Sequence, residues 1–76
     1  MCLALPGRIV ERTGESSAEV DMHGNRFAVR LDLVPEAGVG DWVLVHAGFA
    51  ITKIAESDAR ETWALLEQAG ATDHNA

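Results

Sequence analysis

The chain has 76 residues, enough for one domain, with 12 acidic side chains against 6 basic ones and a formal net charge of −6. This acidic balance, without a basic cluster, argues against nucleic acid and anionic membranes as partners. A single cysteine excludes the disulfide framework of small secreted domains, and no apolar run approaches the about 18 residues of a membrane span. No signal peptide is recognisable either, so we expect a reduced, cytoplasmic protein.

The chain opens with an apolar, uncharged leader, Met1-Cys2-Leu3-Ala4-Leu5-Pro6-Gly7. Initiator methionine is generally removed when the second residue is small, which would leave an α-amino group and a thiol on Cys2. Such an amino-thiol is a soft metal ligand, a nucleophile or one half of a mixed disulfide. Two plainer interpretations stay open: the cysteine is a small hydrophobe without a role, and the leader is a first strand entering the core.

A β-hairpin is the clearest local structure. Residues 8–12 form a short β-prone run, and Gly24-Asn25 then predicts a two-residue turn between two alternating segments. In that register apolar residues face apolar ones, and an acid faces a base. The expected cross-strand pairs are Met22 with Phe27, Val20 with Val29, Ala18 with Leu31, Glu19 with Arg30 and Asp21 with Ala28.

Two further strands are expected after a turn-rich loop over residues 35–41. Residues 42–46 are apolar on both faces, which is typical of a strand covered on both sides. The pair Ala47-Gly48 is suited to a tight turn into residues 49–54. About five short strands with tight turns predict a mainly β protein, a small antiparallel barrel.

The last predicted element is a helix that ends near Gly70. Asp58 with Glu61 three residues later resembles a capping box, and Ser57 is the alternative N-cap. Tryptophan and leucine side chains at helical spacing are expected to pack the helix on the barrel. The stripe consists of Ala59, Trp63, Leu66 and Ala69, with Leu65 beside it. We therefore expect one domain over residues 1–70 and a disordered tail over 71–76.

Side chains with metal or catalytic chemistry are few: one cysteine and three histidines, too sparse for a structural zinc site. His46 is either a strand-end histidine bonded to backbone or a ligand or proton acceptor directed towards Cys2. His23 is predicted to be a solvated turn residue, and His74 to lie in the tail. Trp42 and Trp63 are interpreted as packing anchors.

Two separated motifs resemble the HypC/HupF family of hydrogenase assembly chaperones. The first is the opening M-C-L-A-L-P-G-R-I-V, and the second is G-D-W-V-L-V-H-A-G-F-A-I over residues 40–51. The segments L-D-L-V-P-E and E-T-W-A-L-L-E are also similar to family members. The resemblance extends from residue 1 to about residue 69.

The resemblance implies an OB-like five-stranded barrel with a C-terminal helix and a protein that is not an enzyme. It implies a role in building the iron centre of [NiFe] hydrogenases, whose iron carries two cyanides and one carbon monoxide. The partners would be the iron–sulfur scaffold protein HypD and the precursor of the hydrogenase large subunit, with no permanent cofactor. Cys2 would hold the iron fragment, and His46 is the next candidate ligand. The partner-binding residues would be those of the leader: Met1, Cys2, Leu3, Ala4, Leu5 and Pro6.

Two other classes of function are weighed against this one. An OB-like nucleic-acid-binding module would need a basic groove and exposed aromatic residues, which the acidic chain with its two phenylalanines, two tryptophans and no tyrosine does not favour. A thiol enzyme or redox sensor would need a base near Cys2, and only His46 is a candidate for that base.

Overall fold

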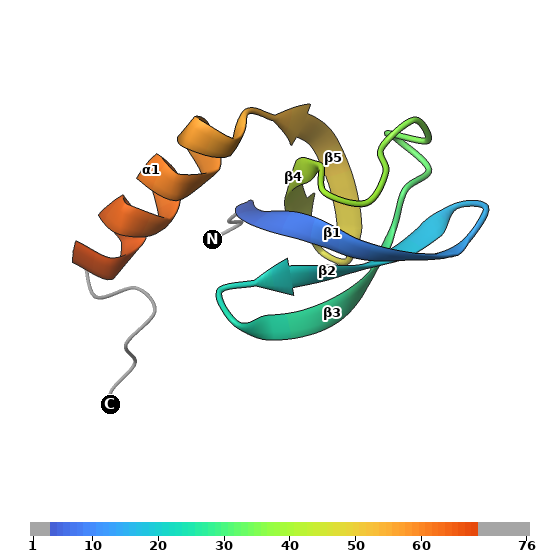
Figure 1. The fold of residues 1–76 in the computed structure, drawn as a ribbon, viewed down its shortest axis with the longest axis horizontal. Coiled ribbons are helices and arrows are strands. Elements are labelled where there is room, and N and C mark those ends of the chain that lie inside the picture. Colours follow the sequence, from blue (N-terminus) through green and yellow to red (C-terminus); the bar gives the residue numbers. More distant parts are fainter. Residues whose placement is uncertain (1–3, 69–76) are drawn as a thin grey trace.

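The protein forms a five-stranded barrel followed by one helix (Figure 1). The structure is a computed structural model, and it describes residues 4–68. Its elements are β1 (Leu5–Gly14), β2 (Ser17–Met22), β3 (Asn25–Arg30), β4 (Trp42–His46), β5 (Phe49–Ile54) and α1 (Glu56–Gln68). The mainly β architecture with a C-terminal helix is confirmed, and it is consistent with the OB-like description.

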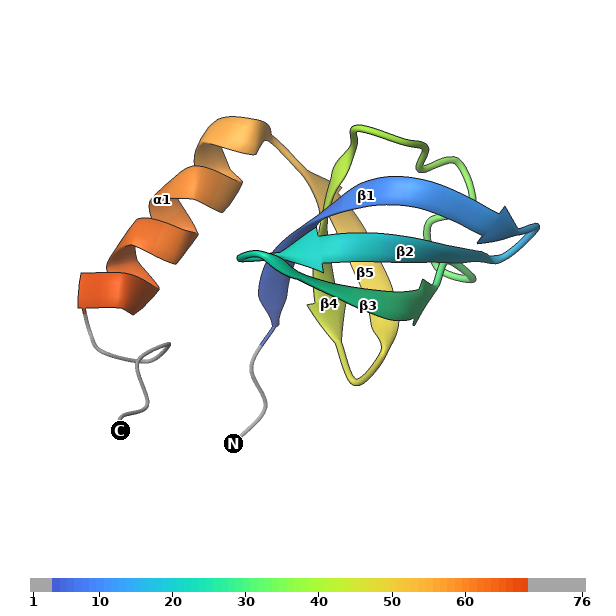
Figure 2. The same cartoon turned by 60° about the horizontal axis from the view of Figure 1, so that its bottom comes forward.

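The barrel closes in the order β1-β2-β3-β5-β4, so the prediction of a purely antiparallel barrel is wrong at one pair. Four neighbouring pairs are antiparallel, whereas β3 and β5 are parallel. An odd number of strands cannot alternate in direction around a closed ring, so at least one pair must be parallel. Figure 2 shows β3 crossing β4 and β5 at an angle, and the parallel pairing consists of the single rung between Arg30 and Phe49.

The hairpin between β2 and β3 turns one residue earlier than the sequence predicts. The turn residues are His23 and Gly24, with φ angles of 55° and 94°, which suits a two-residue hairpin turn of the primed type. The Asp21 carboxylate supports this turn by accepting a hydrogen bond from the Gly24 N–H at 3.1 Å. The predicted Gly24-Asn25 turn is wrong because His23 itself adopts the left-handed conformation.

The earlier turn shifts the strand register by two residues, and all five predicted cross-strand pairs change. Val20 lies opposite Phe27 instead of Val29, and Glu19 lies opposite Ala28 instead of Arg30. A two-residue shift keeps every side chain on its predicted face, because side chains alternate with a period of two. The other pairs are Ala18 with Val29, Asp21 with Arg26, Met22 with Asn25 and Ser17 with Arg30.

The first strand is longer than the predicted run of residues 8–12, because it includes part of the leader. Pro6 and Gly7 are buried, and Leu5 is half-buried. A Cβ atom on Gly7 would lie 2.8 Å from Cγ of Met22, so only glycine lets β1 pass this close to β2. The interpretation of the leader as a first strand is therefore correct from Leu5 onwards, while residues 1–3 lie outside the described part.

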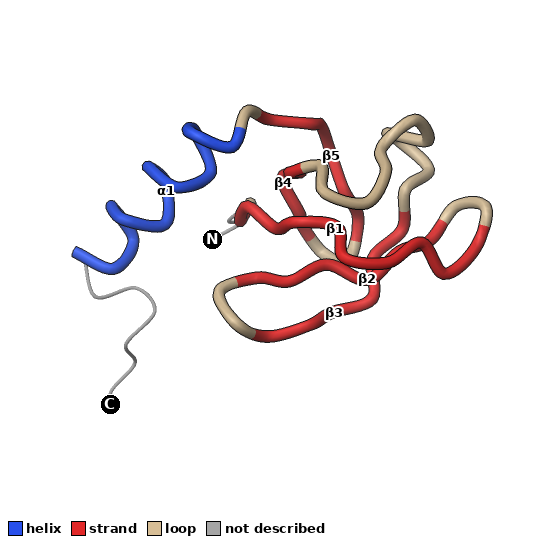
Figure 3. Tube along the Cα trace, viewed as in Figure 1, coloured by secondary structure: helices blue, strands red, loops and turns tan. Residues whose placement is uncertain are grey.

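The predictions for β4 and β5 are confirmed residue by residue, including the Ala47-Gly48 turn with φ angles of 53° and 84°. The connection from β3 to β4 contains no helix or strand (Figure 3). Its apolar side chains Leu31, Val34 and Ala37 are buried and close one end of the barrel. The core consists of Ile9, Ala18, Val20, Val29, Leu31, Val34, Ala37, Val43, Val45 and Ala50.

The helix begins at Glu56, so neither Asp58 nor Ser57 is the N-cap. The carbonyl oxygen of Ala55 accepts the first helical hydrogen bond, from Ala59 N–H at 3.1 Å. Asp58 instead lies in the first turn, where its charge is favourable for the helix dipole. Only Ala55 separates the last residue of β5, Ile54, from the first residue of the helix, Glu56.

The predicted packing stripe of the helix is buried as far as the structure describes it, except for the leucine beside it. Ala59 is fully buried, Trp63 and Leu66 are half-buried, and Leu65 is 61% exposed. In Figures 1 and 2 the helix extends away from the barrel, at the end opposite the loop between β3 and β4. The predicted helix end and tail (Ala69, Gly70 and residues 71–76) lie outside the described residues.

Candidate functional site

Trp63 joins three elements at the barrel end that faces the helix. Its indole Nε1 donates a hydrogen bond to the carbonyl oxygen of Pro6 in β1 at 2.9 Å. The His23 ring stacks on the indole with a centroid distance of 4.6 Å and an interplanar angle of 18°. His23 Nε2 also lies 2.7 Å from the Glu67 carboxylate on the next helical turn. The helix is thus attached both to the start of β1 and to the turn between β2 and β3.

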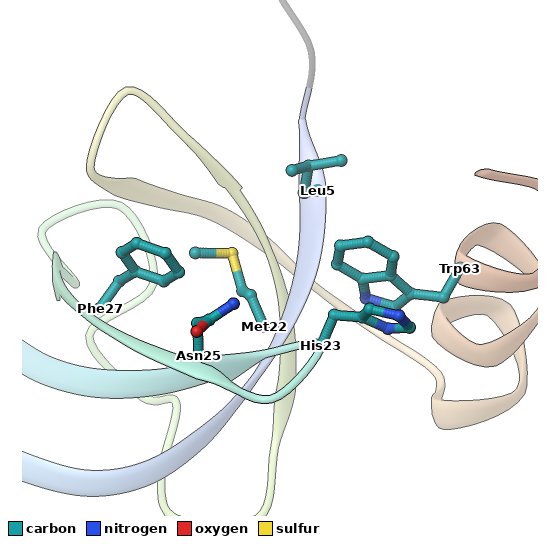
Figure 4. Close-up of a pocket in the computed structure, with 6 residues that line it drawn as sticks. All are labelled: Leu5, Met22, His23, Asn25, Phe27 and Trp63. Atoms are coloured by element: carbon teal, nitrogen blue, oxygen red, sulfur yellow. The ribbon is translucent and has the colours of Figure 1, made fainter. Parts of the chain in front are cut away.

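An open, mainly apolar cavity of about 260 Å³ lies beside this contact (Figure 4). We call it the mouth hollow, because it lies at the barrel end that the loop between β3 and β4 does not close. Met22 and Phe27 are directed into it from the hairpin, and Leu5 and Trp63 border it on the other side. The full lining is Leu5, Met22, His23, Asn25, Phe27 and Trp63.

The strand register explains why the mouth hollow is apolar. Phe27 lies opposite the core residue Val20, so its side chain is on the inward face of the barrel. The Phe27 side chain is nevertheless 49% exposed, because Val29 is the only buried residue of β3 and the strand contributes no core residue at the hairpin end. A cavity at the end of a small barrel, with apolar walls and few polar groups, is a typical binding location.

The leader approaches the mouth hollow directly. Ala4 is exposed, Leu5 lines the cavity, and Pro6 is buried beneath the helix contact. Of the predicted partner-binding residues, the structure therefore leaves Ala4 and part of Leu5 accessible, whereas the Pro6 side chain is covered by the protein itself. Met1, Cys2 and Leu3 lie outside the described residues.

His46 ends β4 close to the start of β1. Leu5 pairs with Val45, and continuing this ladder by one residue places Ala4 opposite His46. The His46 side chain is half-buried and has no hydrogen bond to any side chain or backbone group within residues 4–68. The interpretation that the His46 ring is hydrogen-bonded to backbone is therefore not supported, because no backbone group within residues 4–68 is its partner. No cluster of three potential metal ligands exists in that part of the chain either.

Perturbed carboxyl groups occur away from the mouth hollow and have structural partners. A hydrogen bond from the Gly38 backbone lowers the pKa of Asp41, and Lys53 at 3.3 Å contributes in the same direction. The bidentate contact with Arg30 lowers the pKa of Asp32 and raises that of the arginine. Through these contacts the loop between β3 and β4 is attached to Arg30 of β3 and to Lys53 of β5.

The model of the HupF/HypC family matches residues 1–66, which include both sequence motifs. The chain belongs to the HupF/HypC family. It is 44% identical over 70 residues to the hydrogenase maturation factor HypC of Azotobacter chroococcum, covering 92% of this chain and 83% of the relative. It is 45% identical over 69 residues to HypC of Helicobacter hepaticus, covering 90% and 80%. With HypC of Synechocystis it shares 41% over 75 residues, covering 92% and 99%.

The contacts that His23 makes with the helix in this HupF/HypC family member were not predicted from its sequence. His23 does lie in a turn, as expected, but it also stacks on Trp63 and pairs with Glu67. The one sequence signal for these contacts is that His23 precedes a glycine in a two-residue turn, which places its ring at the end of the hairpin. In the described part of the chain, the helix is too short and too polar to span a membrane.

Proposed function

We propose that this protein is a chaperone in the maturation of [NiFe] hydrogenases and acts in the cytoplasm. Membership of the HupF/HypC family over residues 1–66 carries this proposal, together with relatives named hydrogenase maturation factors. The chain binds and transfers its cargo without catalysing a reaction on it.

The cargo is iron with two cyanides and one carbon monoxide, and the Cys2 thiolate holds it. Thiolates are soft ligands suited to such an iron centre. A carrier must also release what it binds, so one or two protein ligands serve better than a closed four-ligand cage. The sparse ligand set of this chain is consistent with a carrier whose partners supply the remaining ligands.

His46 is the proposed second residue of the cargo site. Its ring has no hydrogen-bond partner within residues 4–68, and the ladder between β1 and β4 continues from Leu5 towards it. One residue, Leu3, separates Ala4 from Cys2, so the two Cα atoms can lie up to about 7 Å apart in an extended chain. The length of the leader is therefore compatible with Cys2 and His46 acting on the same iron.

The partners are a HypD-type iron–sulfur scaffold protein, which donates the fragment, and the hydrogenase large-subunit precursor, which receives it. The exposed Ala4 and the half-buried Leu5 offer apolar contacts next to the mouth hollow. Residues 1–5 would bind each partner in turn, with the buried Pro6 fixing the point where they leave the barrel, so that the thiol reaches the site of transfer.

Infrared spectroscopy tests this function. The protein is purified anaerobically from cells that mature a hydrogenase, as wild type, Cys2→Ala and His46→Ala, with Glu36→Ala as a control at an exposed residue that does not line the mouth hollow. We expect cyanide and carbonyl stretching bands in the wild type and the control, none in Cys2→Ala and weaker bands in His46→Ala. Unchanged bands and full hydrogenase maturation with Cys2→Ala would contradict the proposal.

A further inference from the structure

The outer edge of β3 has backbone groups without a partner in the described chain. Across a two-residue turn Met22 and Asn25 form a hydrogen-bonded pair, so Phe27 and Val29 also bond to β2. The residues between them, Arg26 and Ala28, direct their N–H and C=O groups to the other side of β3.

The pairing of β3 with β5 confirms that alternate residues of β3 direct their backbone groups away from β2, but this pairing is limited to one residue pair, Arg30 with Phe49. The N–H of Arg30, two residues after Ala28, donates to the carbonyl oxygen of Gly48 in the turn before β5 at 2.8 Å. No other strand or loop within residues 4–68 bonds to Arg26 or Ala28 on that side. We call the outward groups of these two residues the free edge of β3. An exposed edge of this kind can pair with an added strand.

The free edge runs directly beside the mouth hollow, because Phe27 lies between Arg26 and Ala28 and lines the cavity. An added antiparallel strand would exchange hydrogen bonds with Arg26 and Ala28. Its residue opposite Phe27 would then be in a non-hydrogen-bonded position, where opposing Cα atoms are only about 4.5 Å apart. The side chain of that residue is on the inward face and meets the apolar cavity.

We propose that β3 binds an extended segment of a partner protein by strand addition, with one large aliphatic side chain of the segment in the mouth hollow. An extended backbone is required because only its alternating N–H and C=O groups match the free edge. An aliphatic anchor is required because the cavity is lined mainly by Leu5, Met22, Phe27 and the Trp63 indole. This surface is built without Cys2 and needs no iron.

Other occupants fit the free edge less well. A second copy of this chain carries the same net charge of −6, so the two copies repel each other. Residues 69–76 (Ala-Gly-Ala-Thr-Asp-His-Asn-Ala) contain no large apolar side chain for the cavity. The leader contains Met1 and Leu3, and it is distinguished from a partner segment by the experiment below.

The test is an amide NMR titration of the full chain with the capped peptide acetyl-Thr-Thr-Leu-Thr-Thr-amide. We expect shifts at the free edge and mouth hollow, and slower hydrogen exchange at Arg26 and Ala28 in the complex. Methylating the amide nitrogens of the two threonines next to leucine should weaken binding at least tenfold, because it removes the donors. Replacing leucine by alanine should weaken it about tenfold through lost burial.

A matched pair of protein variants distinguishes a loss of hydrogen bonding at the free edge of β3 from a loss of the folded barrel. Ala28→Pro removes an outward N–H and should abolish peptide binding, whereas Ala28→Val keeps it and should bind as the wild type does. Thermal unfolding of both variants checks that the barrel is intact, and N-methylation of the peptide tests the edge without any substitution. The proposal is overturned by shifts on another face, equal binding of the methylated peptide, or dimerisation through β3. It is equally overturned if Arg26 and Ala28 are already protected in the free monomer, which would mean that the chain's own leader occupies the edge.

Discussion

The indole N–H of Trp63 donates to the carbonyl oxygen of Pro6, 57 residues earlier in the chain, at 2.9 Å. The same indole is stacked by His23, so one side chain holds the start of β1, the hairpin turn and the helix together. Pro6, near the end of the leader, is therefore held in place by the helix. Displacing the helix would change where the leader leaves the barrel, which links helix docking to the proposed position of Cys2.

Replacing Trp63 by phenylalanine should reduce stability by removing this hydrogen bond while keeping an aromatic ring. We expect the free energy of unfolding in urea to fall by about 1 kcal/mol, the typical value of one such bond. Amide hydrogen exchange in α1 should also become faster, because the helix loses its link to β1. Trp42→Phe is the matched control, since its indole has no hydrogen bond within the described chain. An equal loss in both variants would show that ring volume, not the bond to Pro6, is responsible.

Strand positions were predictable here because alternation and turn residues are local signals. Residues 42–46 and 49–54 form strands as predicted, and Ala47-Gly48 forms the turn. The hairpin before them was misplaced because the pattern of apolar residues has a period of two. A shift by two residues satisfies that pattern equally well, so only the left-handed conformation of His23 decides the register.

The candidate site was only partly predictable, because it depends on contacts between distant segments. Family motifs identified Cys2 and His46, and His46 does lie near the start of β1. Nothing in the sequence indicated that Trp63 bonds to Pro6, since the two residues are 57 positions apart. β3 and β5 pair only at Arg30 and Phe49, which leaves the rest of the β3 edge free beside the mouth hollow. No local sequence pattern specifies this pairing between distant strands.

The His23→Asn variant distinguishes the two roles of His23, its left-handed backbone in the hairpin turn and its side-chain contacts with the helix. Asparagine tolerates the left-handed backbone that His23 adopts at φ 55°, so the hairpin should keep its stability within about 0.5 kcal/mol. The stacking on Trp63 and the contact with the Glu67 carboxylate are lost, so the indole should become more accessible. Acrylamide quenching of tryptophan fluorescence measures this change, and the Trp42→Phe background isolates the Trp63 signal. Unchanged quenching would mean that the stack does not shield the indole.

Gly24→Ala is the complementary change at the same turn. Its added Cβ meets no atom within 4 Å, but the backbone has φ 94°, which is costly for any residue with a side chain. We expect a loss of about 1 kcal/mol in the free energy of unfolding from this strain. Gly38→Ala serves as the control, because its Cβ also meets open space and its φ is not positive. Equal stability of the two variants would contradict the importance of the left-handed turn.

Gly7→Ala should disturb the mouth hollow from inside the barrel. The new Cβ would lie 2.8 Å from Met22 Cγ and 3.3 Å from Val20 Cγ2, so the methionine must move. We expect overpacking to cost about 1–2 kcal/mol of unfolding free energy and the Met22 side chain to be displaced into the cavity. Adding Met22→Ala makes space for the new methyl group. In the Gly7→Ala/Met22→Ala protein the loss should be smaller than the sum of the two single losses, and strict additivity would exclude this contact as the cause.

Asp41→Asn should lower stability in a pH-dependent manner. The hydrogen bond from Gly38 N–H and the nearby Lys53 lower the pKa of Asp41 in the folded state, so folding favours the ionised carboxylate. The stabilisation is therefore present above the unfolded pKa of about 3.9 and is lost as the pH falls through the lower folded value. Because the group is partly exposed, we expect only about 0.5–1 kcal/mol at pH 7. Urea unfolding at pH 7 and near pH 2.5 should show the wild type and Asp41→Asn converging in acid, whereas the exposed control Glu36→Gln should differ little from the wild type at pH 7. A difference between Asp41→Asn and the wild type that stays constant with pH would show that the charge of Asp41 does not stabilise the loop.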